Sequence, residues 1–114
     1  MDLYEKLVKT NPGNGSVNEY RYLGALIEKY APGNLLVFSV GKDSNLWMTL
    51  NKNGNTVFCE DVRKWIRFSR KITPEIYIVK VNYRTRRKQW KELLGQNHKL
   101  QMRLPDFVKN TVWD

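Results

Sequence analysis

The sequence has few of the residues that build cross-linked or metal-bound frameworks. Its 114 residues include one cysteine, Cys59, and one histidine. This excludes an internal disulfide framework and argues against a zinc site made within the chain. No apolar run approaches the ~20 residues that a membrane span needs, and residues 1–10 are too polar for the apolar core of a signal peptide. We therefore expect no metal and no membrane span, and a chain that is soluble as written and cytoplasmic by default.

Acidic residues are also scarce relative to basic ones. The chain has 11 Asp and Glu against 20 Lys and Arg, so its formal net charge is +9. A charge of this sign favours nucleic acid, an anionic membrane surface or an acidic sugar polymer, and it does not choose among them. With 41% hydrophobic and 27% charged residues, the composition is that of an ordinary globular protein. The length suits one small domain.

The stretch 34–61 organises the chain. It begins with an apolar run at residues 35–38, turns at Gly41, continues as an amphipathic segment, turns again at residues 53–54 and ends in an apolar run that leads to Glu60. This order predicts a strand, a helix and a second strand. Glu60 follows Gly41 by about 20 residues, the spacing at which two parallel strands place a carboxylate on a nucleotide ribose.

Strands and helices alternate along the whole chain. Strands are predicted at residues 35–40, 56–59 and 76–81, and helices are predicted to begin near Ser16, Ser44, Asp61 and Thr85. Such alternation is typical of α/β folds with a doubly wound sheet. We expect three parallel strands with flanking helices, a partial Rossmann-like domain over residues 16–114 and an N-terminal extension over residues 1–15. Strand one would be central, with strands two and three to one side. A fourth strand, absent from this chain, would lie on the other side.

Helix starts and buried faces follow from local patterns. Ser16 and Glu19 fit a capping box, and Asp61 fits an N-cap. Helical spacing predicts three inward faces: Tyr20, Leu23, Ile27 and Tyr30 in the first helix, Leu46, Trp47 and Leu50 in the second, and Val62, Trp65 and Ile66 in the third.

Gly41 is the first candidate for contact with a ligand. A glycine at the end of strand one lets a ligand approach the backbone, and the N–H groups of Ser44 and Asn45 would face it. A tight turn without a ligand explains the glycine equally well. The dinucleotide pattern G-x-G-x-x-G is absent after Gly41, which argues against NAD and FAD. S-adenosylmethionine, a nucleoside ligand without a pyrophosphate, remains possible, and Asp43 would then meet its ammonium group.

The end of strand two offers two carboxylates, Glu60 and Asp61. A carboxylate at this position can accept hydrogen bonds from both ribose hydroxyls, whereas helix capping is the alternative role. We expect Asp61 to cap the helix. We expect Glu60 to bind the ribose because it ends the strand itself.

Residues 84–88 form a basic run that contains Arg84, Arg86 and Arg87. The run is either a solvated helix face or a binding surface for a polyanion. Helix starts normally favour acids over arginines, so the two interpretations stand level. The sequence identifies no catalytic base.

Several segments together resemble the glucuronoxylan 4-O-methyltransferase and irregular-xylem-15-like family. The resemblance extends over nearly all of the chain from Asn18 onward, and the common order of the motifs makes it specific. Residues 36–47 (LVFSVGKDSNLW) resemble the family's LVFGLGHDSLMW, residues 50–61 its LNHGGRTVFLEED, residues 82–85 its YRT or YTT segment, and residues 104–106 with 112–114 its LP…WD segment.

The resemblance implies a Rossmann-like methyltransferase that uses S-adenosylmethionine. In plants the family O-methylates glucuronic acid side chains of xylan in the Golgi, or supports xylan deposition. By position, Gly41, Asp43 and Ser44 would line the cofactor and Glu60 would hold its ribose. The basic run 84–88 would suit an acidic polysaccharide substrate.

Two departures from the family leave other functions open. Lys42 stands where the family usually has histidine, and the family continues past the position of residue 114 into a fourth strand. An enzyme, a small module that binds nucleic acid or another polyanion, and a non-catalytic family remnant are therefore the three hypotheses, and the motif order favours the family. Without a fourth strand, the apolar edge of strand one invites homodimerisation or poor solubility.

Overall fold

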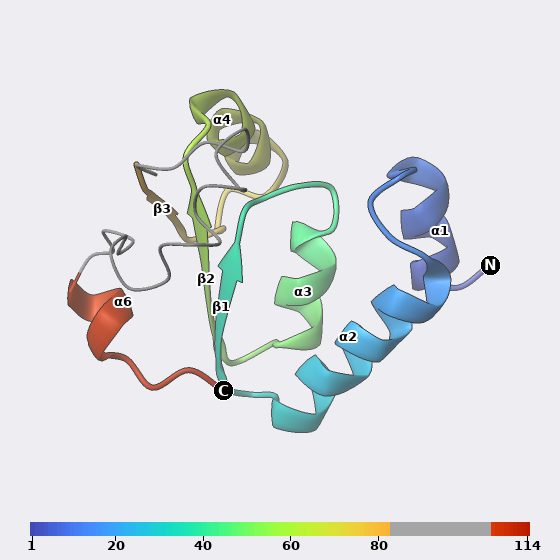
Figure 1. The fold of residues 1–114 in the computed structure, drawn as a ribbon, viewed down its shortest axis with the longest axis horizontal. Helices are drawn as coiled ribbons and strands as arrows, with labels where there is room; N and C mark the ends of the chain where they lie inside the picture. Colours follow the sequence, from blue (N-terminus) through green and yellow to red (C-terminus); the bar gives the residue numbers. More distant parts are fainter. Residues whose placement is uncertain (83–105) are drawn as a thin grey trace, which may run out of the picture.

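The computed structural model describes residues 1–82 and 106–114, which form an α/β unit (Figure 1). Strands and helices alternate from residue 34 onward, as the sequence predicts. The helix predicted from Thr85 lies outside the described residues. The elements are α1 (Leu3–Thr10), α2 (Val17–Tyr30), β1 (Asn34–Phe38), α3 (Ser44–Leu50), β2 (Asn55–Glu60), α4 (Arg63–Ile72), β3 (Ile78–Lys80) and α6 (Asp106–Asn110).

The described strands form one parallel sheet in the order β1-β2-β3. This confirms the three predicted parallel strands, with β2 and β3 to one side of β1. Within the described residues β2 is the middle strand and β1 lies at an edge, so the central place predicted for strand one depends on a further strand. In register, Val37 lies opposite Phe58, and Phe58 lies opposite Ile78.

The core lies on the face of the sheet that carries this row of side chains. Phe58 is fully buried and packs in one cluster with Trp47 of α3, Ile66 of α4 and Leu7 of α1. Cys59 points to the opposite face because successive residues of a strand alternate. It is also fully buried, and burial raises the pKa of its thiol. Because Leu7 joins the core, α1 packs with the rest of the structure, and the boundary at residue 15 stays a prediction.

The buried face of α2 differs from the predicted one. Tyr20 is buried, but Leu23 and Tyr30 are 46% and 55% exposed. The helix is instead buried at Gly24, where a Cβ atom would clash with the side chain of Tyr4 from α1. The close approach of α1 therefore turns α2 so that its glycine faces inward.

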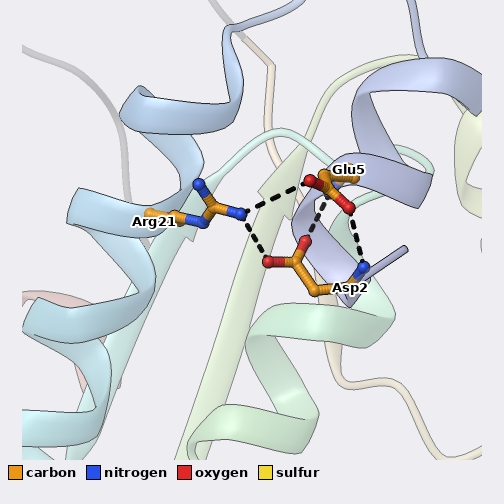
Figure 2. Close-up of polar contacts among 3 residues, drawn as sticks. All are labelled: Asp2, Glu5 and Arg21. Atoms are coloured by element: carbon orange, nitrogen blue, oxygen red, sulfur yellow. Dashed lines mark hydrogen bonds and ion pairs between the residues drawn. The ribbon is translucent and has the colours of Figure 1, made fainter.

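Side chains from the helix starts fix α1 and α2. Asp2 and Glu5 form a reciprocal capping box at α1, and the guanidinium of Arg21 from α2 lies 2.5 Å from the Asp2 carboxylate (Figure 2). At α2, Ser16 Oγ accepts a hydrogen bond from the Glu19 N–H at 3.2 Å, as predicted. The Glu19 carboxylate accepts from the Ser16 hydroxyl and not from its backbone, so half of the predicted capping box forms.

The edge of β1 that faces away from β2 is hydrogen-bonded at one end to Asp114. The N–H of Asp114 donates to the carbonyl of Asn34 at 2.8 Å, and the N–H of Asn34 donates to the Asp114 carboxylate at 2.7 Å. Figure 1 shows the C-terminus at the foot of β1. Asp114 thus lies on the side of β1 away from β2. Phe38 at the other end of β1 is 51% exposed, so the face of the sheet that carries its side chain is partly uncovered there.

The short helix α6 lies on the other side of the strands from α3 (Figure 1). The ring of its Phe107 meets Tyr77 edge to face at 6.0 Å, and its Val108 is buried. Across the described residues, none of the helices combines the length and apolarity needed to cross a membrane.

Candidate ligand-binding site

A cavity of about 530 Å³ lies where β1 and β2 end. In parallel α/β sheets, ligands bind outside the carboxyl ends of the strands, in the crevice between the loops that follow them. The loop after β1 supplies half of the lining, and the start of α4 and the loop after α1 supply most of the rest. The lining residues are Asn11, Asn14, Ser39, Val40, Gly41, Lys42, Asp43, Glu60, Val62 and Trp65.

The cavity brings together three of the four predicted cofactor residues, namely Gly41, Asp43 and Glu60. The fourth, Ser44, is 4% exposed and lines a neighbouring cavity of about 130 Å³. Its hydroxyl accepts a hydrogen bond from the Gly41 N–H at 2.9 Å, and its own N–H donates to the Gly41 carbonyl at 3.2 Å. The Ser44 N–H predicted to face a ligand is therefore already used, and Ser44 shapes the turn.

Glu60 joins the ends of the two strands. Its Oε1 accepts from the N–H of Val40 at 3.1 Å, and its Oε2 accepts from those of Asp61 at 2.9 Å and Val62 at 3.1 Å. The side chain is 5% exposed. Burial by itself would raise its pKa, but the hydrogen bonds from Val40, Val62 and Asp61 together outweigh that effect and lower the pKa of Glu60 below its ordinary value. The carboxylate is thus held ionised.

These bonds restrict what Glu60 can offer a ligand. A carboxylate oxygen accepts about two hydrogen bonds, so Oε2 is filled and Oε1 has room for one more. Glu60 can therefore hold one ribose hydroxyl, whereas the sequence predicts that it holds two.

The predicted cap at Asp61 is wrong. The N-cap of α4 is Val62, and no side chain caps it. The N–H groups of Asp61 and Val62 bind Glu60 instead, which keeps the backbone extended for one more residue. Burial and the neighbouring Glu60 raise the pKa of Asp61.

Asp43 is the carboxylate most available to a ligand. It occupies the N-cap position of α3 but makes no side-chain capping bond, because its backbone is helical there. It is half-buried and lines the cavity. A Cβ atom at Gly41 would lie 3.3 Å from Asp43 Oδ1, so Gly41 leaves room for this carboxylate. Lys42, which replaces the family's histidine, donates from Nζ to the Thr10 carbonyl at 3.0 Å and ties α1 to the site.

Sequence reasoning missed two features of the cavity wall. Val62 and Trp65, predicted to point into the core, are 42% and 41% exposed and line the cavity instead. Ser39 has φ of +87°, a backbone conformation that favours glycine. The family signature LVFGLGHDSLMW has glycine at this position, and that mismatch is the signal that identifies Ser39.

Arg84, Arg86 and Arg87 lie outside the described residues, so their place relative to the cavity stays a prediction. No group of three or more potential metal-ligating side chains occurs among residues 1–82 and 106–114.

The fold and cavity define the class of protein, an α/β protein with a ligand-sized cavity at the carboxyl ends of parallel strands. Within this class the chain belongs to the IRX15/IRX15L/GXM family, whose family model matches residues 18–114.

Curated relatives come from Arabidopsis thaliana. The chain is 32% identical over 108 residues to Arabinogalactan O-methyltransferase 1, a match that covers 78% of this chain and 37% of the relative. It is 35% identical over 81 residues to Protein IRX15-LIKE, covering 70% of this chain and 26% of the relative. It is 31% identical over 105 residues to Glucuronoxylan 4-O-methyltransferase 3, covering 78% and 35%. The matches thus span between 26% and 37% of the length of these relatives. No solved structure matches it.

Proposed function

We propose that the chain forms the cofactor-binding part of an S-adenosylmethionine-dependent O-methyltransferase with a Rossmann-like domain. Its acceptor would be glucuronic acid side chains of xylan or a related acidic polysaccharide. The observation that carries the proposal is the cavity at the ends of β1 and β2, which has two carboxylates, Asp43 and Glu60, in its wall. Relatives named as methyltransferases of glucuronoxylan and arabinogalactan support the choice of reaction.

The carboxylate acceptors of the cavity suit a cationic nucleoside ligand. S-adenosylmethionine, when bound, would supply a methyl group from its sulfonium to a sugar hydroxyl. Asp43 would accept hydrogen bonds from the ligand's ammonium group, and Glu60 Oε1 would accept one ribose hydroxyl. Trp65 offers an aromatic surface at the cavity wall. These contacts fix position, which is the main demand of an in-line transfer. The hydroxyl proton requires a base, and no residue is assigned to that role.

Titration calorimetry with S-adenosylmethionine and with its demethylated product tests the proposal. Asp43→Asn should weaken binding of the cationic cofactor about tenfold, since a charge-assisted hydrogen bond contributes roughly 1.5–3 kcal/mol before solvent exposure reduces it. Asp106→Asn is the matched control, because it removes the same charge from α6, whose residues do not line the cavity. Binding that is absent from the parent protein, or equal in the parent and Asp43→Asn, would contradict the proposal.

A further inference from the structure

The outer surface of α4 combines positive charge with exposed apolar side chains. Its ten residues, RKWIRFSRKI, include five cations and no acid. Ile66 and Ser69 face the core. Among the described residues, the ion pairs join only Arg21 to Asp2 and Glu5. The positive charge of α4 is therefore not neutralised within the described part of the chain.

Three apolar side chains form a stripe along α4. Trp65, Phe68 and Ile72 are 41%, 40% and 62% exposed, and their i, i+3, i+7 spacing places them on one line of the helix. The rings of Trp65 and Phe68 meet edge to face with centroids 5.8 Å apart. Because residues three and four positions apart are surface neighbours on a helix, Lys64 and Lys71 lie beside Phe68. The apolar stripe and the lysines thus share one surface, which we call the α4 stripe: Lys64, Trp65, Phe68, Lys71 and Ile72.

The α4 stripe borders the candidate cofactor site. Trp65 lines the cavity of about 530 Å³, and Phe68 and Ile72 line the neighbouring cavity of about 130 Å³. Gly41 and Lys42 line both cavities. A polymer lying along the stripe would therefore pass beside the wall of the site proposed to hold the methyl donor.

We propose that the α4 stripe binds a polysaccharide that carries uronic acids. Apolar and aromatic side chains pack against the C–H faces of sugar rings, and the two lysines pair with uronate carboxylates. An exposed apolar patch with a charged rim is typical of a binding surface, and the absence of acids on α4 gives it charge complementarity to this polymer. The inference rests on the proposed function for its choice of polyanion and adds the surface that would hold the acceptor.

Affinity electrophoresis in gels containing glucuronoxylan tests the α4 stripe. Lys64→Gln with Lys71→Gln should weaken retention of the chain about tenfold, as expected for the loss of two partly exposed ion pairs. Phe68→Ala should weaken it independently of charge. Arg63→Gln with Arg70→Gln is the matched control, because it removes the same charge from the same helix and neither arginine lies three or four positions from a residue of the stripe. Its retention should stay near that of the parent. Circular dichroism verifies that each variant is folded.

The outcomes separate this inference from the proposed function. Equal losses in the lysine and arginine pairs would show a general charge effect and overturn the α4 stripe. The inference would also be overturned if the lysine pair lost retention in gels that contain DNA but kept the parent's retention on glucuronoxylan. That result would indicate a nucleic-acid surface. Calorimetry with S-adenosylmethionine on the lysine pair should give the parent's affinity. If the parent does not bind the cofactor at all, the proposed function fails whatever the gels show.

Discussion

Replacing Glu60 by alanine should destabilise the fold strongly, before any effect on a ligand can be measured. Three backbone N–H groups, from Val40, Asp61 and Val62, donate to this carboxylate at the ends of β1 and β2. Leaving a buried donor without a partner costs about 1–3 kcal/mol. Water from the adjoining cavity can bond to some of these donors, so the low end of this range applies to each donor. Three donors then give about 3 kcal/mol, against a total stability of about 5–15 kcal/mol for a typical domain.

Urea denaturation followed by tryptophan fluorescence measures this loss, since the chain has 4 tryptophans. Glu60→Gln should fall between the parent and Glu60→Ala, because the amide keeps one oxygen acceptor but turns an N–H donor toward backbone donors. A loss below about 1 kcal/mol for Glu60→Ala would refute the reasoning. It would mean that the carboxylate is not engaged by the backbone and is free to hold both ribose hydroxyls.

The pH dependence of the free energy of unfolding gives an independent check on Glu60. The folded pKa of Glu60 lies below its ordinary value of 4.5, so the unfolded state binds its proton first as the pH falls. The contribution of Glu60 to the free energy of unfolding is therefore fully present above pH 4.5. It is lost as the pH falls through the lower pKa of the folded state. Glu60→Gln lacks this contribution, so the gap in stability between the parent and Glu60→Gln should narrow on acidification. A gap that widens would contradict the lowered pKa.

Further predictions concern the strained loop, the basic run and the free sheet edge. Ser39→Gly should raise stability by about 0.5–1 kcal/mol, since relief of a left-handed conformation outweighs the added chain entropy; a lower urea midpoint would contradict this. Replacing Arg84, Arg86 and Arg87 by alanine should weaken retention on glucuronoxylan, and unchanged retention would leave the run as a solvated face. At high concentration the chain should dimerise or precipitate through the edge of β1, as tested by size-exclusion chromatography with light scattering; a soluble monomer at all concentrations would show that the edge is covered.

Much of the fold could be predicted because its signals are local. The apolar runs before Gly41 and Glu60 mark strands whatever surrounds them, and the helix that separates them requires parallel pairing. The buried faces of the helices could not be predicted as well, because they depend on neighbours far away in the sequence. Leu23 and Tyr30 have helical spacing, yet Tyr4 from α1 packs on Gly24 and turns that face outward. The spacing of apolar residues within α2 does not reveal that α1 packs against its glycine.

The candidate site shows the same division. The position of Glu60 at the end of β2 follows from the pattern of the strand, and Asp43 follows from the loop after β1. The hydrogen bond that the Glu60 carboxylate accepts from the Val40 N–H does not follow, because the two residues lie 20 positions apart in the sequence. Helical spacing predicts that Trp65 packs in the core, but the side chain is exposed and lines the cavity. The sequence predicts Asp61 as the N-cap of α4, but the N-cap is Val62, so the helix begins one residue later.

The arrangement of charge explains how one small basic chain could serve two ligands of opposite sign. A net charge of +9 would repel a cationic cofactor unless acids lay close to it, and Asp43 and Glu60 both line the cavity. The lysines of α4 lie outside this wall, where an anionic polymer would meet them. Trp65 belongs to both surfaces, so it marks the boundary at which methyl donor and acceptor would approach each other.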